Sequence, residues 1–200
     1  PASQAYFRAA IMQSALFGLP YKTLEEQVNV GNIFKQGANC RDLNCLKNMS
    51  IKKLLIIEKA FTQQMSLVFS GAKYYIPFTP VIDGQLITRQ PVVGALDKNI
   101  NKPIILGTTK NEAVLFVENR SITPLAYASW TSSLYGIDFE KVIARYPARN
   151  NHHNSVLWAR VQTDNFLTCS NRFVASNYQA PVYAYLFDHH PSFKVWGLSA

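Results

Sequence analysis

One apolar run constrains the fold of this chain more than any other feature. After Lys102 and Pro103, the sequence continues Ile104-Ile105-Leu106-Gly107 with no alternation of apolar and polar residues. A strand with one exposed face alternates, whereas a strand buried on both faces of a parallel sheet is apolar throughout. Residues 102–107 are therefore predicted to form a central parallel strand.

Strands and helices are predicted to alternate along the rest of the chain. Residues 7–14 are a short apolar run typical of a buried strand, and residues 180–187 are a second β-rich run. Residues 22–37 and 50–61 have apolar residues at roughly helical spacing. Residues 138–145 and 155–178 are long, mostly proline-free stretches that also indicate helices. This order predicts an α/β fold with a mostly parallel central sheet and helical crossovers.

Local signals mark several boundaries. Ser50 is a helix cap, and Thr123-Pro124 combines a cap with a proline suited to the first helical position. The segment 77–84 ends in Asp83-Gly84, a dipeptide typical of hairpin turns. We see no internal repeat or linker, so residues 1–200 are expected to be part of a single domain with no internal boundary.

The charge pattern excludes some classes of partner. The net charge is +8, but only Lys52 and Lys53 are adjacent, and no nucleic-acid-binding motif is present. No apolar run approaches the length of a membrane span. We therefore expect neither nucleic-acid binding nor an integral membrane span. Only 16% of the residues are charged, which suggests surface meant to be covered by further parts of a longer protein.

Metal, cofactor and self-contained catalytic sites are not predicted. The histidines occur as the pairs His152-His153 and His189-His190, which lack the i, i+4 spacing of helical metal ligands. We interpret them as surface or turn residues. The sequence has no glycine-rich phosphate loop, no CxxC and no GxSxG nucleophile motif.

The cysteines and glycosylation motifs favour an oxidising compartment. Cys40 and Cys45 are close enough to close a small loop, which leaves Cys169 as a thiol or as the partner of a segment outside the chain. Three reduced thiols are the alternative. Asn48 and Asn119 begin N-x-S motifs, which would be glycosylated in a secretory pathway. We expect a secreted or secretory-lumen protein.

A single glutamate, Glu112, follows the apolar run. Thr109 and Glu112 have the T-x-x-E spacing of a capping box ahead of Ala113-Val114-Leu115-Phe116. Taken alone, this pattern predicts a helix cap.

Five segments together indicate a family. They are FRAAIMQSA (7–15), NCRDLNCLKNMS (39–50), PFTPVIDG (77–84), PIILGTTKNEAVLF (103–116) and APVYAYLFDHHPS (180–192). Their order and approximate spacing resemble the type-B carboxylesterases, which include cholinesterases and bile-salt lipases. The resemblance covers nearly the whole chain and implies a partial α/β-hydrolase fold. It implies a serine hydrolase that cleaves carboxylic esters through an acyl-enzyme.

The resemblance also assigns a role to Glu112. The family's catalytic acid lies in a G-x-x-x-[DN]-E turn after a central strand, and this position corresponds to Glu112. The nucleophilic serine and the catalytic histidine fall outside the chain, so neither His189 nor His190 is assigned as catalytic. We favour the catalytic acid over the helix cap, and we expect the 200 residues alone to be inactive.

Disulfides are implied in the same way. The family has a short-loop bridge in the segment that contains Cys40 and Cys45. A second bridge joins the region of Cys169 to a cysteine farther along the chain.

The substrate pocket is implied by position within the same segments. Tyr74 and Ile76 correspond to acyl-pocket positions of cholinesterases, and Leu115 and Phe116 to two pocket aromatics. Leucine offers no ring face to a quaternary ammonium, so a choline ester is disfavoured. The expected substrate is a small-molecule or lipid ester, with no cofactor.

Two alternatives stay open at this point. A cholinesterase-like adhesion or interaction protein would keep the fold without catalysis. A truncated gene product without a stable fold is the other. The expected partners are the ester substrate and the remaining parts of the same esterase chain.

Overall fold

The computed structural model describes residues 2–68, 71–117, 121–149, 154–189 and 192. The chain forms two compact units, each with its own apolar core. The sheet unit comprises Pro1–Leu19, Pro91–Ser129 and Ile143–Ala200, and the helical unit comprises Pro20–Gln90 and Trp130–Val142.

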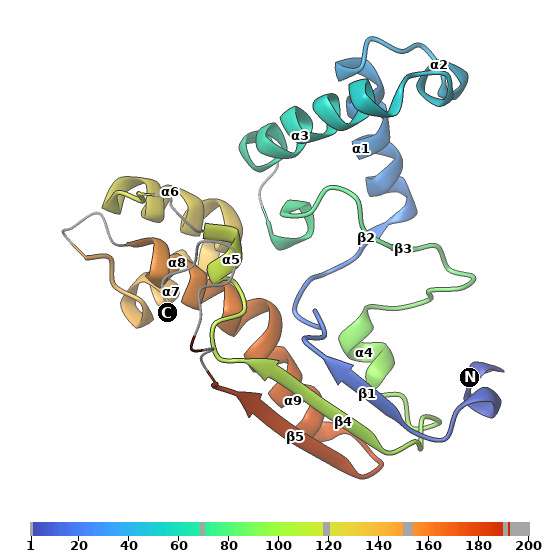
Figure 1. The fold of residues 1–200 in the computed structure, drawn as a ribbon, viewed down its shortest axis with the longest axis vertical. Coiled ribbons are helices and arrows are strands. Elements are labelled where there is room, and N and C mark those ends of the chain that lie inside the picture. Colours follow the sequence, from blue (N-terminus) through green and yellow to red (C-terminus); the bar gives the residue numbers. More distant parts are fainter. Residues whose placement is uncertain (1, 69–70, 118–120, 150–153, 190–191, 193–200) are drawn as a thin grey trace. The chain divides into compact units, whose positions relative to one another are not determined.

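The sheet unit is built on three parallel strands in the order β1-β4-β5. These are β1 (Ala10–Gln13), β4 (Ile104–Thr109) and β5 (Val182–Phe187), which lie side by side in Figure 1. Ala10, Ile104 and Val182 stand in register across them. The predicted parallel α/β architecture is therefore confirmed, with the apolar run 102–107 supplying most of the central strand.

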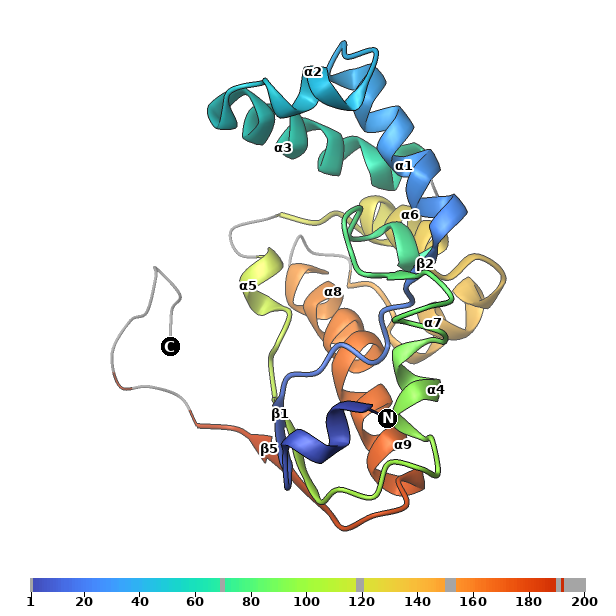
Figure 2. The same cartoon turned by 90° about the vertical axis from the view of Figure 1, so that its right-hand side faces the viewer.

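The two faces of this sheet differ. Ile104 and Leu106 are buried against Val174 of helix α9, which lies along one face (Figures 1 and 2). On the other face, Ile11 and Tyr183 are each 66% exposed. The buried strand expected over residues 7–14 is wrong in this respect: β1 is shorter and alternates half-buried with exposed residues, because only one of its faces is packed.

Helices cover the packed face. The sheet unit contains η1 (Ala2–Tyr6), α4 (Pro91–Ala95), α5 (Val114–Val117), α8 (Asn154–Thr163), the π-turn Asp164–Thr168 and α9 (Cys169–Asn177). The helix predicted over 155–178 is thus confirmed, with a π-turn inside it. Gly18 donates its N–H to Phe166 O at 3.1 Å, and a Cβ on Gly18 would overlap Asn165 O. Only glycine allows the chain to pass this close to the π-turn.

The helical unit packs its two longest helices together. Its elements are β2 (Lys22–Thr23), α1 (Leu24–Gly37), α2 (Leu43–Lys47), α3 (Ile51–Val68), η2 (Ala72–Tyr74) and β3 (Val81–Ile82). Val30 and Phe34 of α1 are buried against Phe61 and Met65 of α3. Both helices were predicted, and Ser50 caps the second, since its Oγ accepts from Lys53 N at 3.4 Å.

The remaining elements follow the predicted starts. α6 (Pro124–Tyr135) passes from the sheet unit into the helical unit, and Thr123 Oγ1 accepts from Ala126 N at 3.2 Å as its cap. The helix predicted over residues 138–145 is confirmed as α7 (Phe139–Arg145), which the short 3-10 turn η3 (Gly136–Asp138) precedes.

The hairpin expected at Asp83-Gly84 is not formed among the described residues. A turn is present, because Asp83 Oδ1 accepts from the backbone N–H groups of Gln85, Leu86 and Ile87, each at 2.9 Å. The preceding strand β3, however, pairs in parallel with β2. The dipeptide encodes the turn, whereas the partner of β3 comes from a distant part of the helical unit.

Candidate active site

Glu112 lies in the turn between β4 and α5 and is half-buried. The turn follows the carboxyl end of a central parallel strand, the edge of an α/β sheet at which active sites gather. This position brings a carboxylate next to the end of the neighbouring strand β1.

One oxygen of Glu112 holds it in place. Oε1 accepts from Thr109 N at 2.6 Å and from Ser14 Oγ at 2.6 Å. Among the residues that the structure describes, no group donates to Oε2. The bond to Thr109 is the carboxylate half of a capping box, but α5 begins only at Val114, beyond Glu112. Local bonding therefore occupies one oxygen and leaves the other open.

Ser14 is a residue of this site that sequence reasoning left without a role. It follows β1 with a φ of 58°, an uncommon conformation for a residue other than glycine. Its N–H donates to Gly107 O at 2.8 Å, which fixes the backbone next to β4. A signal did exist: β1 and β4 are parallel, so the residues just beyond their carboxyl ends are neighbours.

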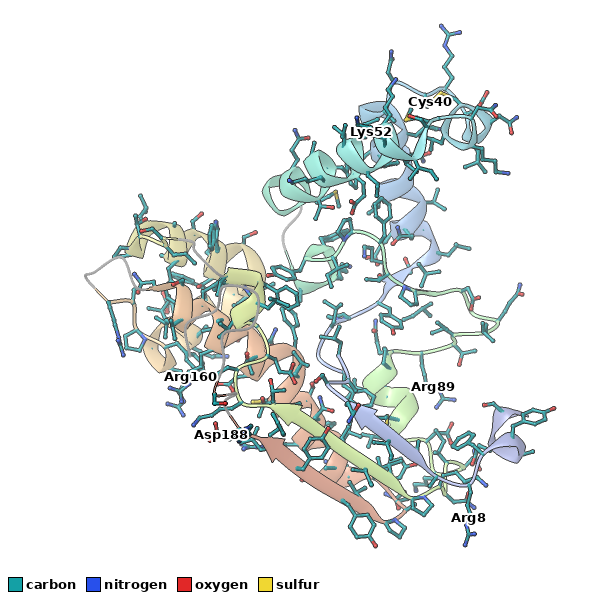
Figure 3. All side chains as sticks on the ribbon, in the orientation of Figure 1. Arg8, Cys40, Lys52, Arg89, Arg160 and Asp188 are labelled. Carbon is teal, nitrogen blue, oxygen red and sulfur yellow. A yellow bond between two sulfur atoms is a disulfide. The ribbon has the colours of Figure 1, made fainter. Side chains whose placement is uncertain are left out.

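The turn that carries Glu112 is anchored from two further elements. Ala113 N donates to Thr163 Oγ1 of α8 at 3.0 Å, in a buried bond. Lys110 N donates to Phe187 O at the end of β5, at 2.9 Å. The Lys110 ammonium also pairs on the surface, at 2.9 Å, with Asp188, which is labelled in Figure 3. Hydrogen bonds from three elements thus pre-organise the turn.

The Tyr185 ring on β5 leaves no room for a side chain at Gly107 of β4. The two strands pair Gly107 with Tyr185, and a Cβ at position 107 would overlap the Tyr185 ring. The ring lies directly over the strand just before the Glu112 turn. A side chain at position 107 would therefore displace either the ring or the strand.

A model of the carboxylesterase family matches residues 1–199. The chain belongs to the carboxylesterase family. Two Dictyostelium discoideum proteins, the cAMP-regulated D2 protein and Crystal protein, are each 28% identical to it, over 94% and 92% of this chain. Acetylcholinesterase of Myxine glutinosa is 28% identical over 58% of the chain.

The fold matches that of a solved esterase. The crystal structure of Geobacillus stearothermophilus carboxylesterase EST55 superposes with a TM-score of 0.69 over 98% of this chain, at 22% identity. This chain covers 41% of that structure, and 37% and 36% of the two Dictyostelium relatives. It therefore spans less than half the length of these matched proteins.

The pocket residues predicted for a carboxylesterase fall into two sets. Leu115 and Phe116 lie on α5 beside Glu112 and are 49% and 61% exposed. Tyr74 and Ile76 belong to the helical unit. Tyr74 packs against the core of that unit, whereas Ile76 is exposed. Their role in substrate binding stays a prediction.

The described cysteines separate into a bridge and a thiol. A disulfide joins Cys40 and Cys45, whose Cα atoms are 5.5 Å apart. Cys169 is an exposed free thiol. Its desolvation by neighbouring groups raises its pKa, and the nearby Asp164 carboxylate raises it further. A raised pKa keeps the thiol protonated and slows its chemistry.

Asp164 also bonds to a tyrosine. The Tyr146 hydroxyl donates to Asp164 Oδ2 at 2.7 Å. Desolvation and this bond raise the pKa of Tyr146 to about 12. The hydroxyl is therefore a stable donor rather than a candidate base.

Other predicted sites are placed only in part. Asn48 is exposed at the end of α2, whereas Asn119 lies outside the described residues. His189 is exposed after β5, and its ring centroid is 6.2 Å from that of Phe187. His152, His153 and His190 lie outside the described part of the chain.

Neither a metal cluster nor a membrane-spanning helix is found in the described ranges. No three His, Cys, Asp or Glu side chains among those residues are grouped to hold a metal ion. The helices searched there are all too short or too polar to cross a bilayer.

Proposed function

We propose that the complete protein hydrolyses carboxylic esters through a serine acyl-enzyme and that Glu112 is its catalytic acid. Membership of the carboxylesterase family supports ester hydrolysis at the level of the family. The observation that carries the specific role is the state of the Glu112 carboxylate. Oε1 is fixed by two short hydrogen bonds, and no described group donates to Oε2.

This geometry suits a partner of a catalytic imidazole. Oε2 would accept the imidazole N–H, hold the ring in one tautomer and stabilise the imidazolium that forms when the serine is deprotonated. The serine would attack the ester carbonyl, and backbone N–H groups would bind the oxyanion. In this proposal, the serine and the histidine come from parts of the protein outside these residues.

The proposed substrate is an apolar small-molecule or lipid ester. Leu115 and Phe116 present apolar side chains on the helix that follows Glu112. Leucine at position 115 gives a cation no aromatic face, which disfavours a choline ester. Tyr74 and Ile76 are proposed to contact the acyl group.

We propose that remaining parts of the same protein cover the sheet face opposite helix α9. Ile11, Ile105 and Tyr183 form an exposed, largely apolar surface on that face. Exposed apolar surface of this kind marks an interaction site. This chain covers 41% of the matched esterase structure. We propose that the residues covering this face belong to the part of the protein that corresponds to the rest of that structure.

A secretory location is supported by two features of the helical unit. Disulfides persist in oxidising compartments, and Cys40 and Cys45 form one. Asn48 is exposed within its N-x-S motif. We expect the endogenous protein to lose mass on treatment with an N-glycosidase, with a smaller loss in the Asn48→Gln variant. An unchanged mass in the wild-type protein would contradict glycosylation.

The catalytic role is tested by Glu112→Gln in the complete protein. Glutamine preserves size but cannot stabilise an imidazolium, so kcat for a p-nitrophenyl ester is expected to fall about 10,000-fold. Glu140→Gln is the matched control, because Glu140 is exposed on α7, and its kcat should be unchanged. Near-normal turnover by a folded Glu112→Gln variant would contradict the assignment.

The second candidate is a non-catalytic adhesion or interaction protein. It is kept because the names of the two Dictyostelium relatives state no hydrolytic activity. A fluorophosphonate probe distinguishes the two functions, because it bonds only to an activated serine. Labelling of the complete protein supports the esterase, and no labelling of the folded protein supports the alternative.

A further inference from the structure

Lys22 is a lysine whose side chain is fully buried, with 0% exposure. Lysine is almost never fully buried unless its ammonium is paired. It lies on β2, directly before the Thr23 cap of α1. Burial lowers its pKa, and the nearby Glu26 carboxylate opposes that shift. Burying an ammonium costs desolvation free energy, so the interactions of Lys22 must offset that cost.

The partners of Lys22 lie in the irregular segment 76–79. Its Nζ donates to Ile76 O at 3.0 Å and to Thr79 Oγ1 at 3.1 Å. Both acceptors belong to the helical unit, as does Lys22 itself. The lysine therefore joins the start of α1 to the connection between η2 and β3.

This connection has few backbone N–H donors. Pro77 and Pro80 lack backbone N–H groups, which removes two donors from a short stretch. Two of its carbonyls accept hydrogen bonds from side chains instead. Lys22 supplies the donor for Ile76 O, and Gln27 Nε2 supplies the donor for Pro77 O at 3.2 Å.

A third contact fixes the residues just before the connection. Lys73 pairs with Glu26, also on α1, and both side chains are roughly one-third exposed. The hydrogen bond lowers the pKa of Glu26 and raises that of Lys73, so both stay charged near neutral pH. Because the pair is partly exposed, we expect it to contribute less than the hydrogen bonds of the fully buried Lys22 side chain.

Ile76 and Phe78 of the same segment are both exposed in part, but they differ in their contacts. The ring of Phe78 lies 5.3 Å from that of Phe34 and 5.8 Å from that of Phe61, so one side of it contacts the helical core, while 42% of the side chain is exposed. Ile76 is 37% exposed, and its carbonyl is the group that Lys22 binds. The lysine thus controls the backbone from which the exposed Ile76 side chain projects.

We infer that Lys22 is a positioning residue that fixes the 76–79 segment and thereby sets the acyl-chain selectivity of the esterase. The inference rests on the proposed function, in which Ile76 contacts the acyl group. Lys22 touches neither the ester nor the reacting atoms. Its effect passes through the Ile76 carbonyl and the Thr79 hydroxyl.

The test compares Lys22→Met with Lys52→Met in the complete protein. Methionine keeps much of the length of lysine but donates no hydrogen bond. Lys52 is exposed on α3, so it controls for loss of a charge (Figure 3). We expect Lys22→Met to raise hydrogen exchange of a peptide covering residues 72–79 by about tenfold or more, with Lys52→Met unchanged.

Selectivity is measured on the same proteins with p-nitrophenyl acetate and p-nitrophenyl octanoate. The ratio of kcat/KM for the two esters is expected to shift by about fivefold or more in Lys22→Met alone. Thr79→Val removes only one acceptor at nearly constant volume and should give smaller changes in the same direction. It also provides the test if Lys22→Met does not fold.

The outcomes separate this inference from the proposed function. Unchanged exchange over 72–79 would overturn the positioning role. Raised exchange with an unchanged ratio in an active enzyme would overturn the effect on selectivity. If the wild-type protein cleaves no ester, the proposed function fails and selectivity fails with it, while exchange still decides whether Lys22 holds the segment.

Discussion

Glu112 in the sheet unit and Lys22 in the helical unit are two charged side chains that differ in burial and in how fully their polar atoms are bonded. Both are held by hydrogen bonds next to a parallel strand. Lys22 is fully buried, and its donors point to groups of its own unit. Glu112 is only half-buried, and one of its oxygens accepts no bond from a described residue.

The difference teaches how to separate a structural charge from a chemical one. A buried charge must be paired within the fold, so its removal is felt in the segment that it holds. A charge fixed on one side and open on the other can bind a further group without rearranging. By this criterion, Glu112 is suited to chemistry, and Lys22 acts through the backbone that it anchors.

The largest effect on stability is expected at Gly107 of β4, the strand that precedes the Glu112 turn. Gly107→Ala would place a Cβ against the Tyr185 ring, and we expect it to reduce the free energy of unfolding by about 3 kcal/mol. Chemical denaturation of the complete protein measures this change. A loss below about 0.5 kcal/mol would show that the ring moves freely and that the sheet does not fix the Glu112 turn.

The matched control lies in the helical unit. Gly31 is inside α1, and a Cβ there would meet no atom within 4 Å. Gly31→Ala should therefore raise the free energy of unfolding by about 0.5–1 kcal/mol, because alanine loses less backbone entropy in a helix. Changes of opposite sign in the free energy of unfolding at Gly107 and Gly31 would show that the first position is closely packed and that the second has room for a side chain.

A smaller effect is expected from Ser14→Ala. The substitution removes one of the two donors to Glu112 Oε1 and leaves Thr109 N in place. A charge-assisted hydrogen bond of this type contributes about 1.5–3 kcal/mol, but the remaining donor limits the loss of orientation. We expect kcat to fall about tenfold, with KM nearly unchanged. Ser14→Thr, which keeps the hydroxyl, should recover part of the rate.

The smallest effect concerns the pH dependence of stability at Lys22. The pKa of Lys22 is lowered from 10.5 in the folded protein, and the charged groups beside it are Glu26 and Lys73. Between the lowered pKa and 10.5, the unfolded chain binds more protons, so folding is stabilised as pH rises. The wild-type protein should therefore gain stability relative to Lys22→Met over that window. A constant difference would contradict a lowered pKa.

Local patterns predicted the elements of the fold better than their pairing. The apolar run at Ile104–Leu106 and the Thr123 cap each encode their element within a few residues, and the structure places both as predicted. The Asp83-Gly84 turn forms, but its strand pairs with β2, because pairing depends on distant residues. Burial of one face of β1 depends in the same way on what covers the sheet.

The candidate site shows the same difference between local features, which the sequence predicts, and long-range contacts, which it does not. Glu112 was predicted from its place after the strand and from the resemblance to the family. Ser14 was missed because its contact spans 98 residues of sequence, and Lys22 because burial of a lysine cannot be inferred from composition. Tertiary hydrogen bonds decide both roles.

The most direct test of Glu112 as the catalytic acid is proton NMR of the complete protein. An imidazole N–H bonded to a carboxylate resonates far downfield of the amide protons. We predict such a resonance in the wild-type protein and in Glu140→Gln, and its loss in Glu112→Gln. A resonance that persists in a folded Glu112→Gln variant would contradict the central claim, because another acceptor would then hold the histidine.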